Sequence, residues 1–235
     1  MIGPIVDSGS LAIGGVLGAL LGTYMPKRVK ETLPLIFGVI TISLGVSLVG
    51  QAEHFPVVVI ALIVGAFIGE LCYAEKGLEI VIKKIMPNSG DNLLPQNHIM
   101  QFVTLIAAFC FGSMGIFGAV NEGISGDPSV LIVKAALDFF SGLIFGSVLG
   151  VRVALIAIPQ FIILIALYFS ATLVMSYISP AMFSNFSSCG GVIFLATGLR
   201  MSDIKVLPVI NMLPALLIVF PLTFLWVKFV VPMTM

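Results

Sequence analysis

Long apolar segments alternate with short polar stretches along the whole chain. Eight such segments can be delimited, at residues 3–24, 34–51, 55–73, 99–119, 130–150, 154–177, 183–199 and 207–230. Most approach the ~20 residues that an α-helix needs to cross a bilayer. The pattern therefore predicts an all-α, polytopic transmembrane helical bundle of about eight spans. The first segment carries Asp7 and the seventh is short, so the count would be seven if one of them were re-entrant.

The composition supports lipid as the solvent for the outer face of the protein. Hydrophobic residues make up 59% and charged residues 9% of the 235 residues, whereas about 25% of residues are charged in soluble domains. We expect a single transmembrane domain over residues 1–235, with a short polar cytoplasmic segment at about 74–98. That segment predicts a short surface helix followed by a turn-rich loop.

Charge and cysteine content exclude several partners and cofactors. The formal net charge is zero and no basic tail is present, so nucleic acid is not an expected partner. The three cysteines, Cys72, Cys110 and Cys189, are scattered, which favours neither a disulfide framework nor a thiolate metal site. We expect no metal and no cofactor. The nucleotide-binding motif G-x-x-x-x-G-K-[ST] does not occur, so ATP is not expected to drive the protein.

The distribution of cations predicts the orientation, because cytoplasmic loops carry most Lys and Arg residues. Nine of the eleven Lys and Arg residues lie in the loops that join the first segment to the second, the third to the fourth, the fifth to the sixth and the seventh to the eighth. The exceptions are Lys134 and Lys228. With eight spans, all of these loops lie on one side, which we expect to be cytoplasmic. Both termini would then face outward.

Glycine recurs at every fourth position in three segments. These stripes are Gly14-Gly18-Gly22, Gly65-Gly69 and Gly142-Gly146-Gly150. Four residues is close to one helical turn, so each set forms a smooth stripe that another helix backbone can approach closely. We expect tight helix packing, and the same stripes would suit a homo-oligomer.

A weak internal repeat relates the second segment to the seventh and the third to the eighth. Residues 38–45 match residues 191–198 through Gly-Val-Ile and a later glycine, and residues 56–58 resemble residues 208–210. Matched segments are five apart, so they would cross the membrane in opposite directions. Inverted repeats of this kind are typical of secondary transporters.

The fifth segment contains two charges, Lys134 and Asp138. A charge within hydrocarbon costs roughly 2.5–3.5 kcal/mol on insertion scales, and the four-residue spacing lets the two side chains neutralise each other on one helix face. Two interpretations stay open. The pair is a structural lock between helices, or Asp138 is a cation or proton site that Lys134 tunes.

A polar, glycine-rich run at residues 112–128 joins the fourth and fifth segments. Asp127 and Pro128 suit a helix start, with Asp127 as the cap and Pro128 at the first position. That role does not explain Asn121-Glu122-Gly123, which predicts unwound backbone beside an acid. Such backbone is tolerated at membrane depth only inside protein or along an aqueous cavity.

Other polar residues extend the candidate site. Asp7, Glu53, Glu122 and Asp127 would make the outward face acidic, and an acidic mouth concentrates cations. Asn211 lies about one turn into the eighth segment, where Pro214 would free the carbonyl of Ile210 and kink the helix. We predict a solute- or ion-binding site between the fourth, fifth and eighth spans, formed by Asn121, Glu122, Asp127, Lys134, Asp138 and Asn211.

Four runs of residues carry a family resemblance. They are residues 1–6, residues 115–129 with their continuation through Lys134 and 138–140, residues 196–200, and residues 208–216. With these runs the chain resembles the bacterial YqgA-like family of uncharacterised inner-membrane proteins. The resemblance covers essentially the whole chain and implies a polytopic fold in the bacterial inner membrane, without an activity or a substrate. Asp7 stands where the family has asparagine, so the resemblance assigns it no site.

Three classes of function follow from these features. We expect a transporter or channel for a small solute or cation, driven by a gradient or passive. The first alternative is a structural or interaction protein that transports nothing. The second is an intramembrane enzyme, since Ser125-Gly126-Asp127 is similar to a motif of intramembrane aspartyl proteases. However, Ile124 stands where that family has glycine, and both histidines lie outside the spans, so we do not expect an enzyme.

Overall fold

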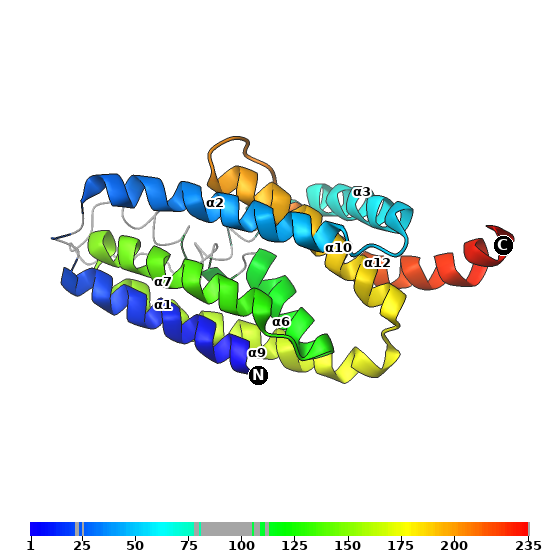
Figure 1. The fold of residues 1–235 in the computed structure, drawn as a ribbon, viewed down its shortest axis with the longest axis horizontal. Helices are drawn as coiled ribbons and strands as arrows, with labels where there is room; N and C mark the ends of the chain where they lie inside the picture. The colour runs from blue at the N-terminus through cyan, green and yellow to red at the C-terminus, as the bar shows by residue number, and fades with distance from the viewer. Residues whose placement is uncertain are drawn as a thin grey trace. The chain divides into compact units, whose positions relative to one another are not determined.

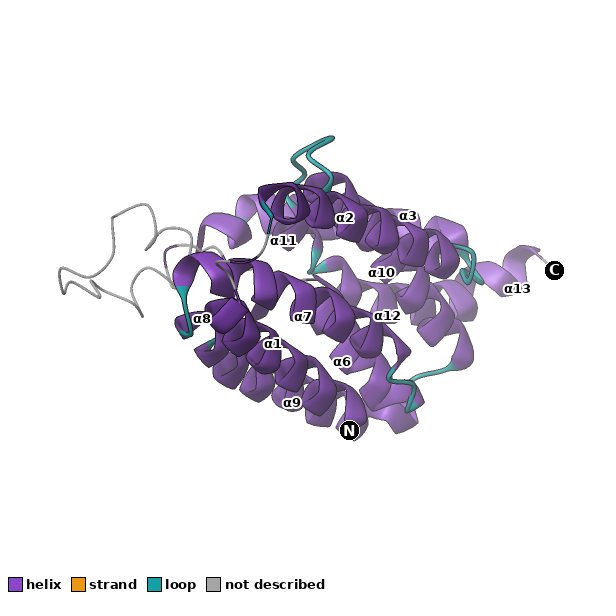
Figure 2. Cartoon of the chain, turned by 60° about the vertical axis from the view of Figure 1, so that its left-hand side comes forward, coloured by secondary structure: helices purple, strands orange, loops and turns teal. Residues whose placement is uncertain are grey.

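The computed structural model describes residues 1–21, 24, 26–77, 80, 105, 109–110 and 113–234. Within these residues all regular structure is helical, and Figure 2 shows helices joined by short loops. The helices are α1 (Ile2–Leu21), α2 (Lys27–Val49), α3 (Phe55–Leu71), α6 (Ser113–Ser125), α7 (Ser129–Leu149), α8 (Arg152–Leu155), α9 (Ala157–Val174), η2 (Met175–Tyr177), α10 (Pro180–Met201), α11 (Val209–Met212), α12 (Ala215–Leu225), η3 (Trp226–Val230) and α13 (Val231–Thr234). The predicted all-α architecture is confirmed.

The chain divides into two compact units, each of which is described by itself. The first comprises residues 1–34 and 76–173, and the second comprises residues 35–75 and 174–235. The first unit contains α1, α6, α7, α8 and nearly all of α9. The second contains α3, most of α2, and the helices from α10 onward. The single domain over residues 1–235 stays a prediction.

Six stretches of the described residues are long and apolar enough to cross a membrane. They are Ile2–Leu21, Lys27–Val49, Ser129–Leu149, Arg152–Val174, Pro180–Met201 and Val209–Val230, and the shorter apolar helix α3 adds Phe55–Leu71. These correspond to seven of the eight predicted segments. The remaining predicted segment is the fourth, residues 99–119. It and the polar segment 74–98 lie mostly outside the described residues, although α6 contains the end of segment 99–119.

One bound of the predicted segments is wrong, and the continuity of two segments, which the sequence left open, is answered. The first and seventh segments are both continuous helices, because α1 passes through Asp7 without interruption and α10 extends over 22 residues. The second helix begins earlier than predicted, so Lys27 and Arg28 lie in the first turn of α2 rather than in a loop. A charged residue is accommodated within α1 because its carboxylate is paired, as the candidate site shows.

Buried polar side chains fix the helix ends of the second unit. Asn185 of α10 is fully buried, and its Oδ1 accepts hydrogen bonds from the backbone N–H groups of Glu53 at 3.1 Å and His54 at 2.9 Å. These residues immediately precede α3, so Asn185 supplies partners where a helix start lacks them. Its Nδ2 donates to Thr223 Oγ1 of α12 at 3.1 Å. One amide thus connects three helices.

In the first unit, α1 and α7 lie side by side (Figure 1), and glycine residues line the contact between them. A Cβ added at Gly14 would overlap the carbonyl oxygen of Phe139, and one added at Gly18 would overlap that of Leu143. The backbones approach so closely because these positions have no side chain. The contacts advance together along both helices, so α1 and α7 run parallel.

The contact between α1 and α7 is reciprocal. A Cβ at Gly142 would lie 3.0 Å from the carbonyl oxygen of Leu11, and one at Gly146 would lie 2.5 Å from that of Gly15. Each helix therefore offers both a glycine groove and a backbone ridge. Gly14 and Gly18 of one predicted stripe therefore pack against the helix that carries Gly142 and Gly146 of another.

Glycine also joins α2 to α10 in the second unit. A Cβ at Gly45 would lie 2.7 Å from the carbonyl oxygen of Gly191, and one at Gly198 would lie 2.6 Å from that of Gly38. Residue numbers rise along one helix as they fall along the other, so α2 and α10 are antiparallel. These four glycines are the ones that define the weak repeat, and the opposite direction of its second and seventh segments agrees with that prediction.

We predict that Gly14→Ala destabilises the protein and that Gly9→Ala does not. Both positions lie on α1, but a Cβ at Gly9 meets nothing within 4 Å, whereas one at Gly14 meets the backbone of α7. Overpacking of this kind typically costs about 1–3 kcal/mol. Thermal unfolding of the purified protein in detergent measures the difference. Equal midpoints for the two variants would contradict the close contact between α1 and α7.

Candidate functional site

Lys134 lies at the centre of a buried charged cluster in the first unit. It projects from α7, and only 4% of the residue is exposed. Its Nζ donates to Oδ2 of Asp7 on α1 at 2.9 Å and to Oδ2 of Asp138, one turn further along α7. The ion pair with Asp138 is the one that the four-residue spacing predicts. The ion pair with Asp7 adds a carboxylate from another helix.

Gln160 of α9 completes this arrangement. Its Nε2 donates to Oδ2 of Asp7 at 2.7 Å and to Oδ2 of Asp138 at 2.8 Å. The amide and the ammonium therefore bridge the same two carboxylate oxygens, and α1, α7 and α9 converge on them. We call Asp7, Lys134, Asp138 and Gln160 the Lys134 cluster.

The Lys134 cluster has one more carboxylate than it has cations. When all of its groups are ionised, it carries a surplus negative charge away from water, which is costly. Two of its buried oxygens, Asp7 Oδ1 and Gln160 Oε1, have no hydrogen-bond partner in the part of the chain that the structure describes. Because buried polar atoms are normally partnered, these oxygens are open positions for a proton, a water molecule or a cation.

The surroundings of Lys134 are small and apolar. A Cβ at Gly115 of α6 would lie 3.3 Å from Lys134 Cε and 3.4 Å from a methyl carbon of Leu164. Leu164 is fully buried and packs with Ala119 and Leu131. A low-dielectric environment strengthens both the attraction within the cluster and the cost of its surplus charge.

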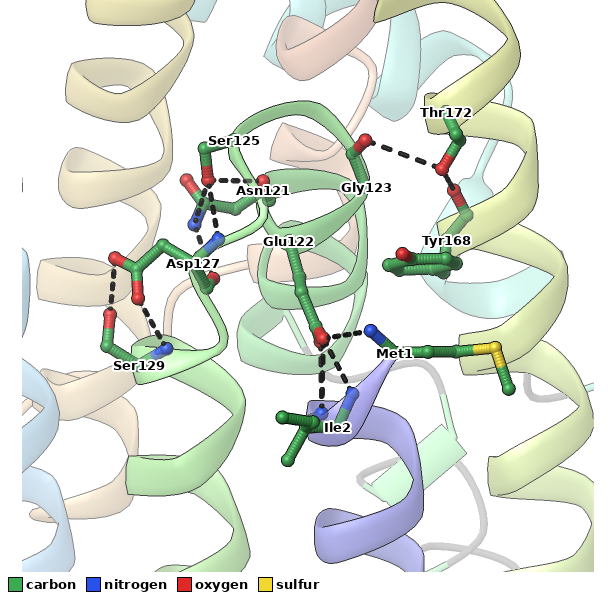
Figure 3. A network of polar contacts seen from close by, with 11 residues as sticks. Met1, Ile2, Asn121, Glu122, Gly123, Ser125, Asp127, Ser129, Tyr168 and Thr172 are labelled. Carbon is green, nitrogen blue, oxygen red and sulfur yellow. Dashed lines mark hydrogen bonds and ion pairs between the residues drawn. The ribbon is translucent and has the colours of Figure 1, made fainter.

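Glu122, predicted as an ion-binding acid, holds the start of α1 (Figure 3). Its carboxylate accepts hydrogen bonds from the backbone N–H groups of Ile2 at 2.8 Å and Gly3 at 3.1 Å, and it lies 2.6 Å from the amino group of Met1. The first N–H groups of a helix favour a carboxylate in this place. The prediction that Asp7 and Glu122 belong to an exposed acidic mouth is therefore wrong, because both carboxylates are buried and engaged.

The predicted unwound backbone at residues 121–123 is also wrong, because α6 continues to Ser125. Asn121 accepts a hydrogen bond from Ser125 Oγ through its carbonyl oxygen at 2.7 Å, and its Nδ2 donates to the carbonyl oxygen of Asp127 at 3.2 Å (Figure 3). Gly126 has a φ of +78°, and its N–H donates to the carbonyl oxygen of Glu122 at 2.8 Å. This glycine ends α6 in the left-handed conformation, so the break falls at residues 126–128.

Asp127 lies at the start of α7, where a capping role was predicted. Its carboxylate accepts hydrogen bonds from the N–H of Ser129 at 3.0 Å and from the hydroxyl of Ser129 at 2.8 Å. The helix itself begins at Ser129, one residue later than predicted. Asp127 is exposed, and these two bonds account for it without a bound ligand.

Asn211 belongs to α11 of the second unit. Its Oδ1 accepts a hydrogen bond from the backbone N–H of Glu75 at 2.8 Å, and the carboxylate of Glu75 pairs with Arg200 at 2.6 Å. Asn211 is therefore engaged within its own unit. Its membership of one site with Lys134 stays a prediction.

The helix interruption predicted beside Pro214 is present, since α11 ends at Met212 and α12 begins at Ala215. The carbonyl of Ile210 is not freed, however. It accepts a hydrogen bond from the N–H of Leu213 at 3.2 Å. The tighter turn compensates for the N–H that proline lacks.

Of the predicted site residues, the structure brings Lys134 and Asp138 together in the Lys134 cluster and Asn121 and Asp127 together at the turn into α7, and it adds two further residues to the Lys134 cluster. Asp7 was set aside because it departs from the family pattern, and Gln160 was missed. A carboxylate in the first apolar segment and a lone amide in the sixth are both expensive in lipid. This unfavourable free energy indicates that each side chain needs a polar partner inside the protein, and Lys134 is such a partner.

Comparison with known proteins is decisive for the family. The family model described as "Protein of unknown function (DUF554)" matches residues 2–224, a range that includes the whole Lys134 cluster. The chain belongs to the DUF554 family. No solved structure matches the chain.

Two relatives extend over nearly the whole chain. It is 42% identical over 229 residues to "Uncharacterized protein YqgA" of Escherichia coli (strain K12), which covers 96% of this chain and 97% of that protein. It is 24% identical over 222 residues to "Uncharacterized membrane protein YdfK" of Bacillus subtilis (strain 168), which covers 93% of each. The YqgA-like resemblance is confirmed. The name of the second relative and the apolar helices together support a membrane protein.

We predict that Lys134→Met destabilises the DUF554 protein strongly and that adding Asp7→Asn restores part of the loss. Removing the ammonium leaves two buried carboxylates unpaired, and breaking a buried pair costs about 3–5 kcal/mol. The second substitution removes one of those carboxylates. Thermal unfolding in detergent gives both values.

The matched control is Lys228→Met, which makes the same substitution at an exposed lysine of η3. We expect it to change the unfolding midpoint little. The account would be refuted if Lys228→Met cost as much as Lys134→Met, or if Asp7→Asn deepened the loss in Lys134→Met.

Proposed function

We propose that this membrane protein is a gradient-driven transporter or a channel for a small solute or cation, with the Lys134 cluster as its charged site. The observation that carries the proposal is the surplus carboxylate of a buried cluster with unpartnered acceptor oxygens. Ionisable residues within membrane spans are rare and commonly mark ion or proton pathways.

The depth of the cluster supports this role. Asp138 is nine residues after the first residue of α7, which corresponds to ~14 Å of helix. This is close to half of the ~30 Å hydrocarbon core. Substrate and coupling-ion sites of secondary transporters are found near this midplane.

The alternative is a structural protein in which the cluster only locks helices together. It is favoured by the way Lys134 and Gln160 tie α1, α7 and α9 to one another. A lock, however, needs only one carboxylate for one ammonium. The second carboxylate adds the desolvation cost of another buried charge and has no cation of its own to neutralise it. This supports a site that takes up positive charge.

An enzymatic role is not proposed. Within the motif Ser125-Gly126-Asp127, the glycine ends α6, and both flanking residues form hydrogen bonds at the turn into α7. Helix capping therefore accounts for these residues.

We further propose eight spans in the bacterial inner membrane with both termini outward. Helices α1 and α7 are parallel, so the chain must cross the membrane an odd number of times between them. Helices α2 and α3 account for two crossings, so one is missing. Helices α2 and α10 are antiparallel, so an even number separates them, and α3, α7 and α9 supply three. One additional crossing between α3 and α7 satisfies both the odd and the even requirement. The predicted segment 99–119, whose end belongs to α6, lies at that place in the sequence.

This topology predicts the accessibility of single cysteines in a variant that lacks the three native ones. A membrane-impermeant maleimide added to spheroplasts should label cysteines at Gln51 and Tyr177. It should label those at Val151 and Ile204 only after lysis. All four positions are exposed. Labelling of Val151→Cys and Tyr177→Cys from the same side would contradict the eight-span arrangement.

Transport is tested by uptake into proteoliposomes across a panel of cations and small metabolites. We expect wild type to move at least one of them and Asp138→Asn to reduce that flux at least ~10-fold, because one of the two charges that attract a cation is lost. The control is Ser170→Ala, since Ser170 is exposed on α9 and bonds within its own helix. No flux with any solute, or equal flux in wild type and Asp138→Asn, would favour the structural alternative.

A further inference from the structure

We propose that the Lys134 cluster binds one exchangeable proton, shared by the carboxylates of Asp7 and Asp138. The inference rests on the proposed function and names the ion at its site. It follows from the number of charges in the cluster and from the position of its unpartnered oxygens.

The donors of the cluster satisfy only one oxygen of Asp7. Lys134 Nζ and Gln160 Nε2 both donate to Asp7 Oδ2, at 2.9 Å and 2.7 Å, while Asp7 Oδ1 is buried without a partner among the described residues. An ionised carboxylate oxygen in this situation is shielded from bulk solvent and receives no hydrogen bond from a described residue, which is costly. A proton on this oxygen removes the cost.

Proton uptake leaves a balanced cluster. One O–H bond forms on the carboxylate pair as a hydronium ion from the solvent gives up a proton and becomes water, and the net charge of the cluster changes from minus one to zero. The remaining carboxylate and the Lys134 ammonium form one ion pair. The same cluster also contains a buried acceptor without a partner among the described residues, the side-chain oxygen of Gln160. Two carboxylates that lie around one site commonly share a single proton in this way.

The groups around the cluster offer no second cation among the described residues. On α1 and α7 the charged side chains that face one another are Asp7, Lys134 and Asp138, and α9 contributes the neutral Gln160. The buried thiol of Cys110 is within electrostatic reach of Lys134 and Asp138 and brings no positive charge. Because no described residue balances the surplus, we assign it to an ion from outside.

A proton suits this site better than a metal cation does. Hard cations take about six or more oxygen ligands, whereas the cluster has two unpartnered oxygens in the described part of the chain. Of the other three carboxylate oxygens, Oδ2 of Asp7 and Oδ2 of Asp138 each accept two hydrogen bonds already. Oδ1 of Asp138 would raise the number of oxygens open to a cation to three, which is still well below six. A proton needs a single oxygen.

Infrared spectroscopy of the purified full-length protein tests the proposal, because a protonated carboxyl has a C=O band that an ionised one lacks. Spectra are recorded from about pH 9 down to about pH 6, where exposed carboxyls stay ionised. We expect one protonated-carboxyl band in wild type. It should be absent from Asp7→Asn and from Asp138→Asn, since each leaves one carboxylate beside one ammonium. The control Asp203→Asn, at an exposed loop position, should retain it.

The two substitutions keep the test decisive if one of them fails to fold. Absence of the band in wild type, or its persistence in both Asp7→Asn and Asp138→Asn, would overturn the proposal. So would loss of the band in wild type on addition of sodium or potassium chloride at constant pH, which would assign the site to an alkali cation. A band that depends on Asp7 without any solute flux would leave the proton site standing and refute transport. Flux without such a band would do the reverse.

Discussion

The burial of one ammonium between two carboxylates is the interaction on which the first unit depends. An unpaired ammonium is unfavourable in lipid, and Lys134 forms ion pairs with both Asp7 and Asp138. Because Asp7 belongs to α1 and Asp138 to α7, this pairing fixes the two helices against each other. Gln160 extends the same constraint to α9. The placement of three helices thus follows from a single electrostatic need.

Glycine makes this electrostatic contact geometrically possible. The backbones of α1 and α7 come together at Gly14, Gly18, Gly142 and Gly146, and short side chains such as aspartate reach across only when helices are close. In the second unit, glycines bring α2 and α10 together, and the buried amide of Asn185 joins α10 to the start of α3 and to α12. Packing by small residues and pairing of polar groups therefore act together, as they do where no hydrophobic force drives helices to associate in lipid.

Much of the fold could be predicted from the sequence, because segment length and hydrophobicity report directly on crossing a bilayer. The pairing of Lys134 with Asp138 could also be predicted from the sequence, because helical periodicity puts residues four apart on one face. The partners from other helices, Asp7 and Gln160, were not accessible, because spacing along one helix says nothing about which helices meet. Glu122 shows the same limit: it looked like an unpaired acid, and its partners are the first N–H groups of α1.

The central claim is that the Lys134 cluster is a working site for a positive ion and more than a lock between helices. An experimental density map of the full-length protein in lipid, at a resolution that shows ordered water, tests it most directly. The account predicts a line of ordered water leading from Oδ1 of Asp7 to one side of the membrane. A dry cluster sealed on every side by apolar packing would contradict it.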